Sequence, residues 1–208
     1  MAIYAEKSEG EFKQVAPGTY VARCISMIEI GTVHEEFQGQ VKSIQKVQIR
    51  WELPTEKAVF DPEKGEQPFS VSKMYTLSMH EKSNLRKDLE SWRGGGFSEE
   101  QARKFDITTL LGKPCILNII HRPSKTNPGR TVTEISSIMP LMKGQVCPDQ
   151  INPTRVLSYD NFNWELYESL SDYTKDKIKS SVEFQLMQEP GLTKDQETGN
   201  DENNDMPF

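Results

Sequence analysis

Cationic side chains recur at even spacing in two stretches of the chain where apolar and polar residues alternate. Lys42, Lys46 and Arg50 stand four positions apart, and Lys73 and Tyr75 stand two apart. In an extended strand, residues separated by an even number of positions lie on the same face. Rows of cations hold phosphates, and an aromatic ring offers a surface on which a base can stack. A face of this kind is what binding to a single nucleic acid strand requires.

The other candidate contacts fall at the start of an expected helix and in a loop between two expected strands. The predicted single-strand contacts are Lys42, Lys46, Arg50, Lys73, Tyr75, Lys82, Arg86, Arg122, Lys125 and Arg130. Phe37 and Phe60 are candidates for base stacking because they fall in expected loops. Trp51 and Trp92 share their faces with aliphatic residues, so we assign them to the core. The alternative interpretation is that the strand cations only solvate the outer face of a barrel.

The acidic residues do not form a catalytic pattern. They include three pairs, Glu35–Glu36, Asp61 with Glu63, and Glu99–Glu100. Each pair falls in a polar loop or a first helical turn, where solvation or the helix dipole favours carboxylates. No serine or cysteine nucleophile lies within a motif, and the three cysteines and three histidines are too scattered for a zinc site. We therefore predict no enzyme activity, no catalytic residue, no metal and no cofactor.

The net charge of −6 is concentrated in the C-terminal third of the chain. Residues 189–208 carry six acids and one base, whereas residues 70–145 carry twelve bases and seven acids. A polyanion is therefore expected to approach the earlier part of the chain. The sequence has no run of eighteen apolar residues and no N-terminal signal sequence. We predict a cytoplasmic protein without membrane contact.

Alternating apolar and polar residues predict five strands. These span 19–30, 40–53, 69–79, 114–122 and 130–139, with a polar connection at 33–39 and a long surface loop at 55–68 after Pro54. Between the third and fourth strands the period changes from two to 3.6. Residues 78–81 match a capping box, apolar residues then recur at helical spacing until Gly94, and residues 98–101 match a second box.

This order of elements predicts a mainly β fold. Three strands, a helical block and two further strands are the order of a five-stranded OB-fold barrel with a helical insertion between strands 3 and 4. Other small β-barrels remain compatible with the pattern. The residues after the last strand predict short helices at 164–170 and 172–180, and a short strand near 156–159.

The expected domain organisation has three parts. They are an OB-fold domain at 1–145 with the barrel at about 15–140, a short helical extension at 146–187 packed on the barrel, and a disordered acidic tail at 188–208. The tail is expected to be disordered because it has too little apolar surface to bury. The extension is expected to pack on the barrel because its helices carry aromatic residues.

The last residues of the tail place a ring and a carboxylate behind a short run of acids. The predicted partner-binding tip comprises Asp201, Glu202, Asp205, Met206, Pro207 and Phe208. Such an end suits a small pocket rimmed with arginine or lysine. The Asp-Met-Pro-Phe sequence closely resembles the acidic tip of bacterial single-stranded DNA-binding proteins. The resemblance implies that the tip recruits replication and repair partners and can compete with DNA for the protein's own binding surface.

Several short segments of the expected barrel carry a second family-like pattern. They are Pro17–Arg23, Gly31–Thr32, Lys73–Lys82, Leu85–Leu89, Trp92–Arg93 and Leu110–Pro114. Over roughly residues 15–145 the chain resembles the phage-encoded OB-fold single-stranded DNA-binding proteins of siphophage replication modules. The resemblance implies a bacteriophage protein that coats and protects single-stranded DNA in DNA replication, recombination and repair, in the cytoplasm of the host cell.

Two other functions stay open at the level of the sequence. The overall acidity, and a charge of only +2 over residues 1–145, favour an OB-fold protein-interaction module of a phage replication complex without strong DNA binding. A nuclease is the third interpretation. The sequence is compatible with a monomer or a homo-oligomer, and with a preference for either DNA or RNA.

Overall fold

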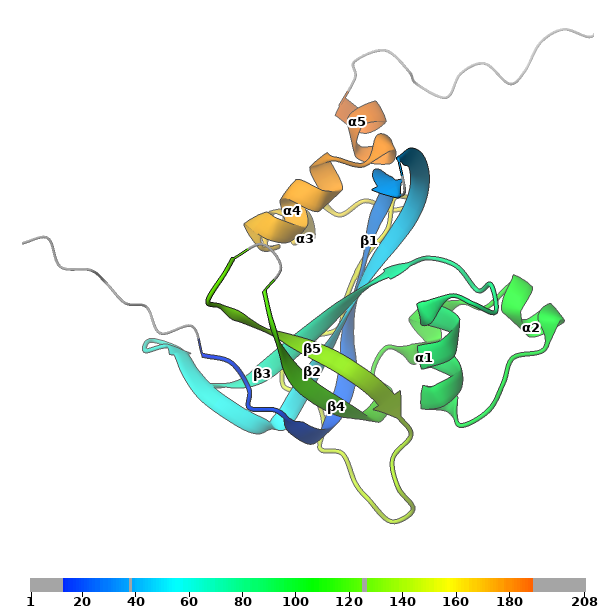
Figure 1. Ribbon diagram of the computed structural model, residues 1–208. Coiled ribbons are helices and arrows are strands. Elements are labelled where there is room, and N and C mark those ends of the chain that lie inside the picture. The colour runs from blue at the N-terminus through cyan, green and yellow to red at the C-terminus, as the bar shows by residue number, and fades with distance from the viewer. Residues whose placement is uncertain (1–12, 38, 125–126, 189–208) are drawn as a thin grey trace, which may run out of the picture.

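The computed structural model describes residues 13–37, 39–124 and 127–188. The elements run in the order β1 (Gly18–Phe37), β2 (Gln40–Asp61), β3 (Gly65–Thr76), α1 (Asn84–Arg93), α2 (Glu99–Arg103), the 3-10 helix η1 (Ile107–Leu110), β4 (Pro114–Pro123), β5 (Thr131–Met139), β6 (Arg155–Leu157), α3 (Trp164–Glu168), α4 (Asp172–Lys179) and α5 (Val182–Gln188). Figure 1 shows the strands curling beside α1, with the C-terminal helices gathered at one end. The acidic tail and its predicted tip lie outside the described residues.

The five long strands form one curled antiparallel sheet in the order β3-β2-β1-β4-β5. The prediction of a mainly β fold built on five antiparallel strands is therefore confirmed, and the sheet curls into a half-barrel (Figure 1). The helical segments α1, α2 and η1 lie between β3 and β4 along the chain. The short strand β6 pairs in parallel with β1, next to residues 26–28.

The strand β2 is longer than its sequence predicts. It continues past Pro54 to Asp61, and a turn with Gly65 at φ 66° leads directly into β3. The predicted surface loop at 55–68 is therefore wrong. A proline cannot donate to the ladder, but here the register with β3 jumps between Leu53 and Lys57, so Pro54 sits in the irregularity where no ladder bond is needed.

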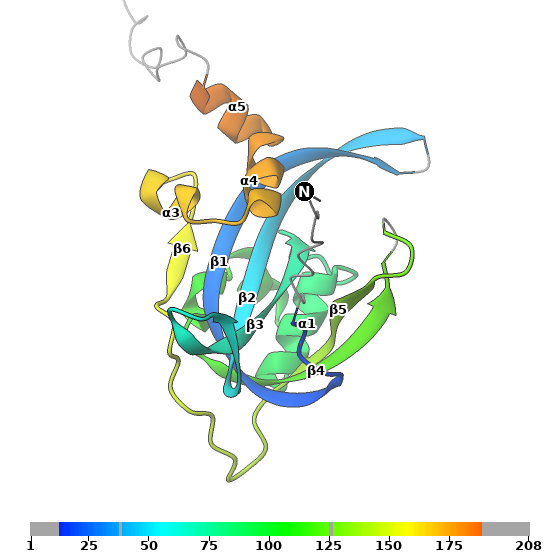
Figure 2. The same ribbon diagram turned by 90° about the vertical axis from the view of Figure 1, so that its left-hand side faces the viewer.

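The strand β1 also runs through residues that the sequence predicts as a polar connection. Its distal part, residues 32–37, pairs with residues 40–45 of β2, while β3 pairs with β2 only from Lys46 onward. This distal hairpin therefore forms a two-stranded arm. Figure 2 shows the arm extending beyond the rest of the sheet. Polar residues suit it because most of the residues at 34–45 whose burial the structure describes are exposed.

The helix α1 begins later than the capping box at 78–81 predicts. Its N-cap is Ser83, whose hydroxyl accepts a hydrogen bond from the backbone N–H of Arg86 at 3.1 Å. Ser78 instead accepts from the N–H of His80 and so caps a turn. The predicted end at Gly94 is confirmed, with φ 73°, as is the second capping box at 98–101. None of the described helices is long and apolar enough to cross a membrane.

Two clusters of buried apolar residues hold the fold together. The larger lies between the inner face of the sheet and α1, and it contains Trp51 and Trp92, whose ring centroids are 6.0 Å apart. The prediction that both tryptophans belong to the core is confirmed. The second cluster joins the outer face of β1, through Ile28 and Ile30, to the C-terminal helices, through Tyr167, Ile178 and Phe184. The C-terminal helices thus pack on the sheet through this cluster.

All three cysteines are free and buried. Burial raises the pKa of the Cys24 thiol to about 12, and burial is also the main cause that raises the pKa of Cys115 and Cys147. Cys147 lies on the segment that leads into β6, and its thiol points at the carbonyl oxygen of Ala22, 3.6 Å away. Because a neutral, buried thiol reacts slowly, the labelling rate of Cys147 reports how firmly this segment stays on the barrel.

Candidate nucleic-acid interface

A hollow of about 460 Å³ opens where β2 and β3 meet the chain that leads into α1. Lys46, Lys73, Tyr75 and Lys82 line it, together with His80. The structure therefore brings four of the predicted contacts to one place. Short polar side chains complete the wall. We call this hollow the basic groove.

Two lysines give the basic groove its accessible positive charge. Lys46, near the base of the two-stranded arm, forms an ion pair with Glu35 across the β1–β2 ladder. Lys82 is exposed, and no carboxylate in the described part of the chain forms an ion pair with it. The Lys46 side chain is 20% exposed and the Glu35 side chain is 44% exposed, so the pair is partly solvated, and a phosphate can replace Glu35 because the displaced carboxylate returns to solvent. Both amines can therefore serve an anionic ligand.

Lys73 and Tyr75 reach the basic groove from the inner face of the sheet. Lys73 stands opposite Ile49 in the β2–β3 ladder, and Tyr75 stands opposite Val47. The amine of Lys73 and the hydroxyl of Tyr75 both donate to Oδ2 of Asp88 on α1, each at 2.7 Å. Lys73 also donates to the carbonyl oxygen of Ile135 on β5, at 3.3 Å. These contacts tie β3 to α1 and to β5.

The role predicted for Tyr75 does not fit its position. Only 3% of the residue is exposed, so its ring cannot stack on a base. Burial, and then the charge of Asp88, raise the pKa of Tyr75, which keeps its hydroxyl protonated as a donor. Sequence periodicity placed Lys73 and Tyr75 on one face correctly, but that face is the inner one. Tyr75 therefore packs beneath the basic groove, where its hydrogen bond to Asp88 ties β3 to α1.

Replacing Asp88 with asparagine is expected to lower the free energy of unfolding by about 2 kcal/mol, because a mostly buried ammonium loses its counter-ion. The Lys73 and Asp88 side chains are 25% and 19% exposed, which reduces the effect below that of a fully buried pair. Urea unfolding measures it. Asp176→Asn, which breaks the exposed pair with Lys179, is the control and should change stability by less than about 0.5 kcal/mol. Equal effects of the two substitutions would contradict this assignment.

Arg86 lies in a structural network instead of at the surface. Its guanidinium donates to the carboxylates of Glu90 and Glu99, at 2.9 and 3.2 Å, and to the carbonyl oxygens of Met79 and Phe97, both at 3.1 Å. The side chain is 7% exposed. The hydrogen bond to Glu90 is the main cause that raises its pKa. The predicted phosphate contact at Arg86 is therefore wrong, since its donors are already occupied in joining α1 to α2.

Three further predicted cations lie on two projecting hairpins. Lys42 is exposed on the two-stranded arm, and Arg122 and Arg130 are exposed on the β4–β5 hairpin. Arg122 pairs with Glu134 at 3.0 Å, and Lys125 lies outside the described residues. In Figure 2 both hairpins project toward the same side of the molecule. The basic side chains on these hairpins can extend a path that begins in the basic groove.

Of the two stacking candidates, the structure describes the side chain of Phe60 but not that of Phe37. Phe60 lies on the β2–β3 hairpin, is 49% exposed, and meets Phe69 edge-on with ring centroids 5.0 Å apart. The side chain of Phe37 lies outside the described residues. Phe60 therefore still offers one ring face. It lies on β2 beyond Leu53, however, at the opposite end of the strand from Lys46.

Arg50 lies apart from the basic groove, on the outer face of the sheet. A separate hollow of about 400 Å³ contains it, together with Arg155 of β6. Sequence reasoning did not select Arg155. The local pattern around it indicates only a short strand, and its place beside β1 depends on a pairing between segments far apart along the chain.

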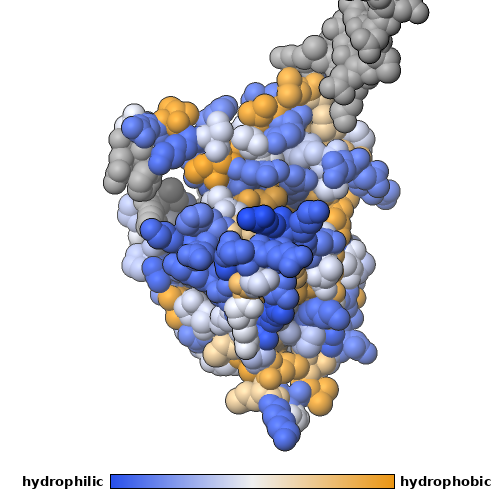
Figure 3. Space-filling model, turned by 90° about the vertical axis from the view of Figure 1, so that its right-hand side faces the viewer, coloured by the Kyte–Doolittle hydropathy of each residue, from blue (hydrophilic) through white to orange (hydrophobic). Residues whose placement is uncertain are grey.

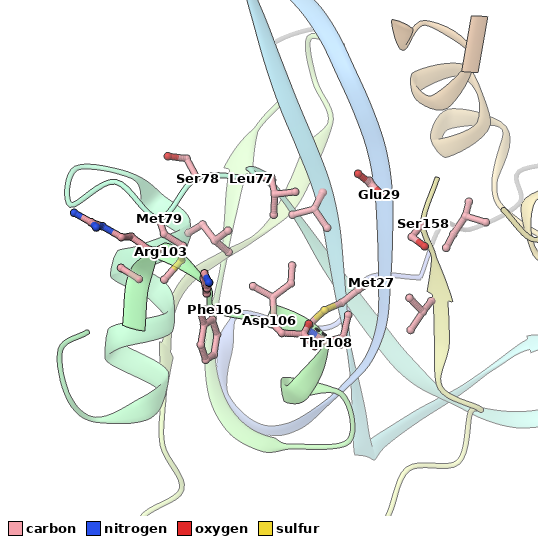
Figure 4. A pocket seen from close by; sticks show the side chains of 17 residues that line it. Met27, Glu29, Leu77, Ser78, Met79, Arg103, Phe105, Asp106, Thr108 and Ser158 are labelled. Atoms are coloured by element: carbon pink, nitrogen blue, oxygen red, sulfur yellow. Dashed lines mark hydrogen bonds between the residues drawn. The ribbon is translucent and has the colours of Figure 1, made fainter. Parts of the chain in front are cut away.

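A third hollow is largely apolar and lies between the helical segments and the sheet. Its volume is about 430 Å³, and Met27, Met79, Phe105 and Val156 contribute to its walls. Figure 4 shows Met27 and Phe105 approaching it from opposite sides. Nearby, the carboxylate of Asp106 accepts from the N–H of Thr108 at 2.9 Å. We call this hollow the apolar pocket; it suits an apolar side chain or ring of a ligand.

The surface over α1 and α2 is predominantly hydrophilic. Figure 3 views this side and shows hydrophilic residues in a broad band across its middle, with apolar patches above and below. Among the residues that the structure describes, no three histidine, cysteine, aspartate or glutamate side chains gather into a potential metal site. Comparison of the chain with protein-family models, with curated proteins and with solved structures finds no match.

Proposed function

We propose that the protein binds single-stranded DNA through an OB-fold barrel. Support for the OB topology comes from the strand order, from the helical block between β3 and β4, and from Lys73, which spans from β3 to the carbonyl of Ile135 on β5. Support for DNA binding comes from the basic groove, where Lys46 and Lys82 converge. This convergence is the observation that carries the proposal.

The proposed mechanism is stoichiometric covering of an exposed strand. Lys46 and Lys82 neutralise phosphates in the basic groove, and the cations of the arm and of the β4–β5 hairpin extend the contact. In phage DNA replication, recombination or repair, such covering protects the strand from nucleases and from pairing. The tip at 201–208, which lies outside the described residues, would recruit replication and recombination proteins.

The proposal is tested by the fluorescence anisotropy of a labelled oligo-dT, with duplex of equal length as competitor. About three phosphate contacts lower the affinity on the order of 20-fold between 50 and 200 mM salt, because each contributes a slope of about −0.7 on single strands. We expect tight binding at low salt, this salt dependence, and little competition by duplex. Absence of binding at low salt, or equal competition by duplex, would contradict the proposal.

A second candidate function is a protein-interaction module without strong DNA binding. The apolar pocket favours this function, because a cavity lined by Met27, Met79 and Phe105 suits an apolar side chain of a partner and does not bind phosphate. The net charge of −6 also favours it. The same titration separates the two functions. A docking module gives weak binding to oligo-dT at every salt concentration.

A further inference from the structure

Two arginines flank one serine across three neighbouring strands on the outer face of the sheet. Ser26 of β1 stands opposite Arg50 of β2 on one side and opposite Arg155 of β6 on the other. Adjacent strands lie about 4.8 Å apart, so the backbones of the two arginines are only about 10 Å apart. Figure 2 shows β6 running beside β1. The two guanidinium groups can therefore reach one small ligand above Ser26.

The hollow that contains Ser26, Arg50 and Arg155 is lined by polar side chains of the kind found in anion-binding sites. Besides the two arginines, its polar side chains come from the sheet and from the C-terminal extension: Ser26, Gln48, Ser70, Asn152, Ser169 and Ser171. No aspartate or glutamate is among the residues that line it. Hydroxyl and amide donors beside arginine are the groups that complement phosphate oxygens.

Neither arginine has a counter-ion among the described residues. The recorded side-chain contact of Arg50 is a hydrogen bond from Nη1 to the hydroxyl of Ser70 at 3.3 Å. Glu52 is the next residue on the same face of β2, but its carboxylate accepts from the backbone N–H groups of Ile151 and Asn152. Burial, and then the charge of Arg155, lower the pKa of Arg50. Two like charges in a partly enclosed hollow are unfavourable until an anion joins them.

We propose that Arg50 and Arg155 form a phosphate-binding subsite, and that its ligand is a backbone phosphate of the bound single strand. This identification of the ligand rests on the function proposed above. Guanidinium groups bind phosphate through paired N–H donors, and two of them can share the oxygens of one phosphate. Because Arg155 belongs to β6, the C-terminal extension is then part of the binding surface and not only a cover for the sheet.

The first arm of the test uses inorganic phosphate as the probe. The melting temperature of the full chain is measured in potassium phosphate and in potassium chloride of equal ionic strength. Phosphate at several times its dissociation constant is expected to raise the melting temperature of the wild type by about 2–4 °C, because it binds only the folded state. Arg155→Gln should abolish this shift, whereas Lys143→Gln, which removes an exposed cation outside the three hollows described above, should retain it. An equal shift in wild type and Arg155→Gln would overturn the subsite.

The same variants separate a binding role from a structural one. Without phosphate, Arg155→Gln should melt no lower than the wild type, because it removes one of two neighbouring like charges. A lower melting temperature would assign Arg155 a structural role and overturn the proposal. This readout needs no ligand, so it stands even where DNA binding fails.

The second arm identifies the source of the phosphate. In the oligo-dT titration, Arg155→Gln should weaken binding about fivefold and reduce its salt dependence, while Lys143→Gln leaves both unchanged. A phosphate shift with unchanged oligo-dT affinity would overturn the strand as the ligand. If the wild type binds no oligo-dT but shows the phosphate shift, the proposed DNA function fails while the anion subsite stands. Displacement of phosphate by an acidic peptide and not by oligo-dT would likewise overturn the strand as ligand.

Discussion

Replacing Glu52 with alanine is expected to lower the free energy of unfolding by about 3 kcal/mol and to loosen the segment before β6. The Glu52 side chain is fully buried on the outer face of β2. Its carboxylate accepts from the backbone N–H of Ile151 at 2.6 Å, and from the backbone and side-chain N–H groups of Asn152 at 2.8 and 2.6 Å. Alanine leaves these donors without an acceptor, and charged hydrogen bonds are among the stronger ones.

Urea unfolding measures the stability, and thiol labelling measures the loosening. In the Glu52→Ala variant, Cys147 should react with a maleimide faster than in the wild type, while Cys24 and Cys115 in the barrel stay protected. Asp149→Ala is the matched control on the same segment, because the Asp149 side chain is fully exposed and meets Arg23 only at 3.6 Å. A Cys147 labelling rate equal to that of the wild type would show that Glu52 does not anchor the segment.

Reversing the charge of both groove lysines, with Lys46→Glu and Lys82→Glu together, is expected to weaken oligo-dT binding about 100-fold. Each reversal removes a phosphate contact and adds repulsion. A loss of affinity of about tenfold per site corresponds to about 1.4 kcal/mol of binding free energy. At position 46 the change also places a second carboxylate beside Glu35. The two lysines lie in the same hollow, so both effects act on one stretch of the strand.

The salt dependence shows whether this loss reflects phosphate contacts. The slope of log affinity against log salt should fall in magnitude by about 1.4, because two contacts are lost at about 0.7 each. Lys143→Glu with Lys179→Glu makes the same change in net charge at two exposed positions outside the basic groove and outside the apolar pocket. An equal loss of affinity in this control would assign the effect to overall charge and contradict a specific groove.

The local elements of the fold follow from the sequence where one residue decides them. Gly94 ends α1 because it adopts the left-handed conformation, and Ser98 begins α2 because its hydroxyl caps an orphan amide. The predicted end of β2 at Pro54 was wrong, because a strand can continue past a proline where its register with the neighbouring strand changes. That change of register leaves residues 54–56 of β2 without a partner on β3, and it depends on the pairing of the two strands, so the sequence of β2 alone does not reveal it.

The candidate site was predicted in part, for reasons that are tertiary. Lys46 and Lys82 are placed in one groove, but Lys73 and Tyr75 face inward. Their even spacing from the apolar residue Val71, which puts all three on one face of the strand, is the signal in the sequence that indicates this. Arg86 reads as a surface cation until α2 is placed beside it, because its partners come from two separate segments. Arg155 has no local signal, since its position depends on parallel pairing with β1.

The parallel pairing of β6 with β1 also has a consequence for folding during translation. The edge of β1 beyond Arg23, where β4 stops pairing, is taken by β6 at residues 26–28. During translation, β6 is synthesised about 130 residues after this part of β1, which at about 5–20 residues per second is roughly 6–26 s. For that interval the nascent chain presents an open strand edge next to apolar Ile28 and Ile30. Co-translational aggregation or chaperone capture is therefore expected to concentrate at this edge.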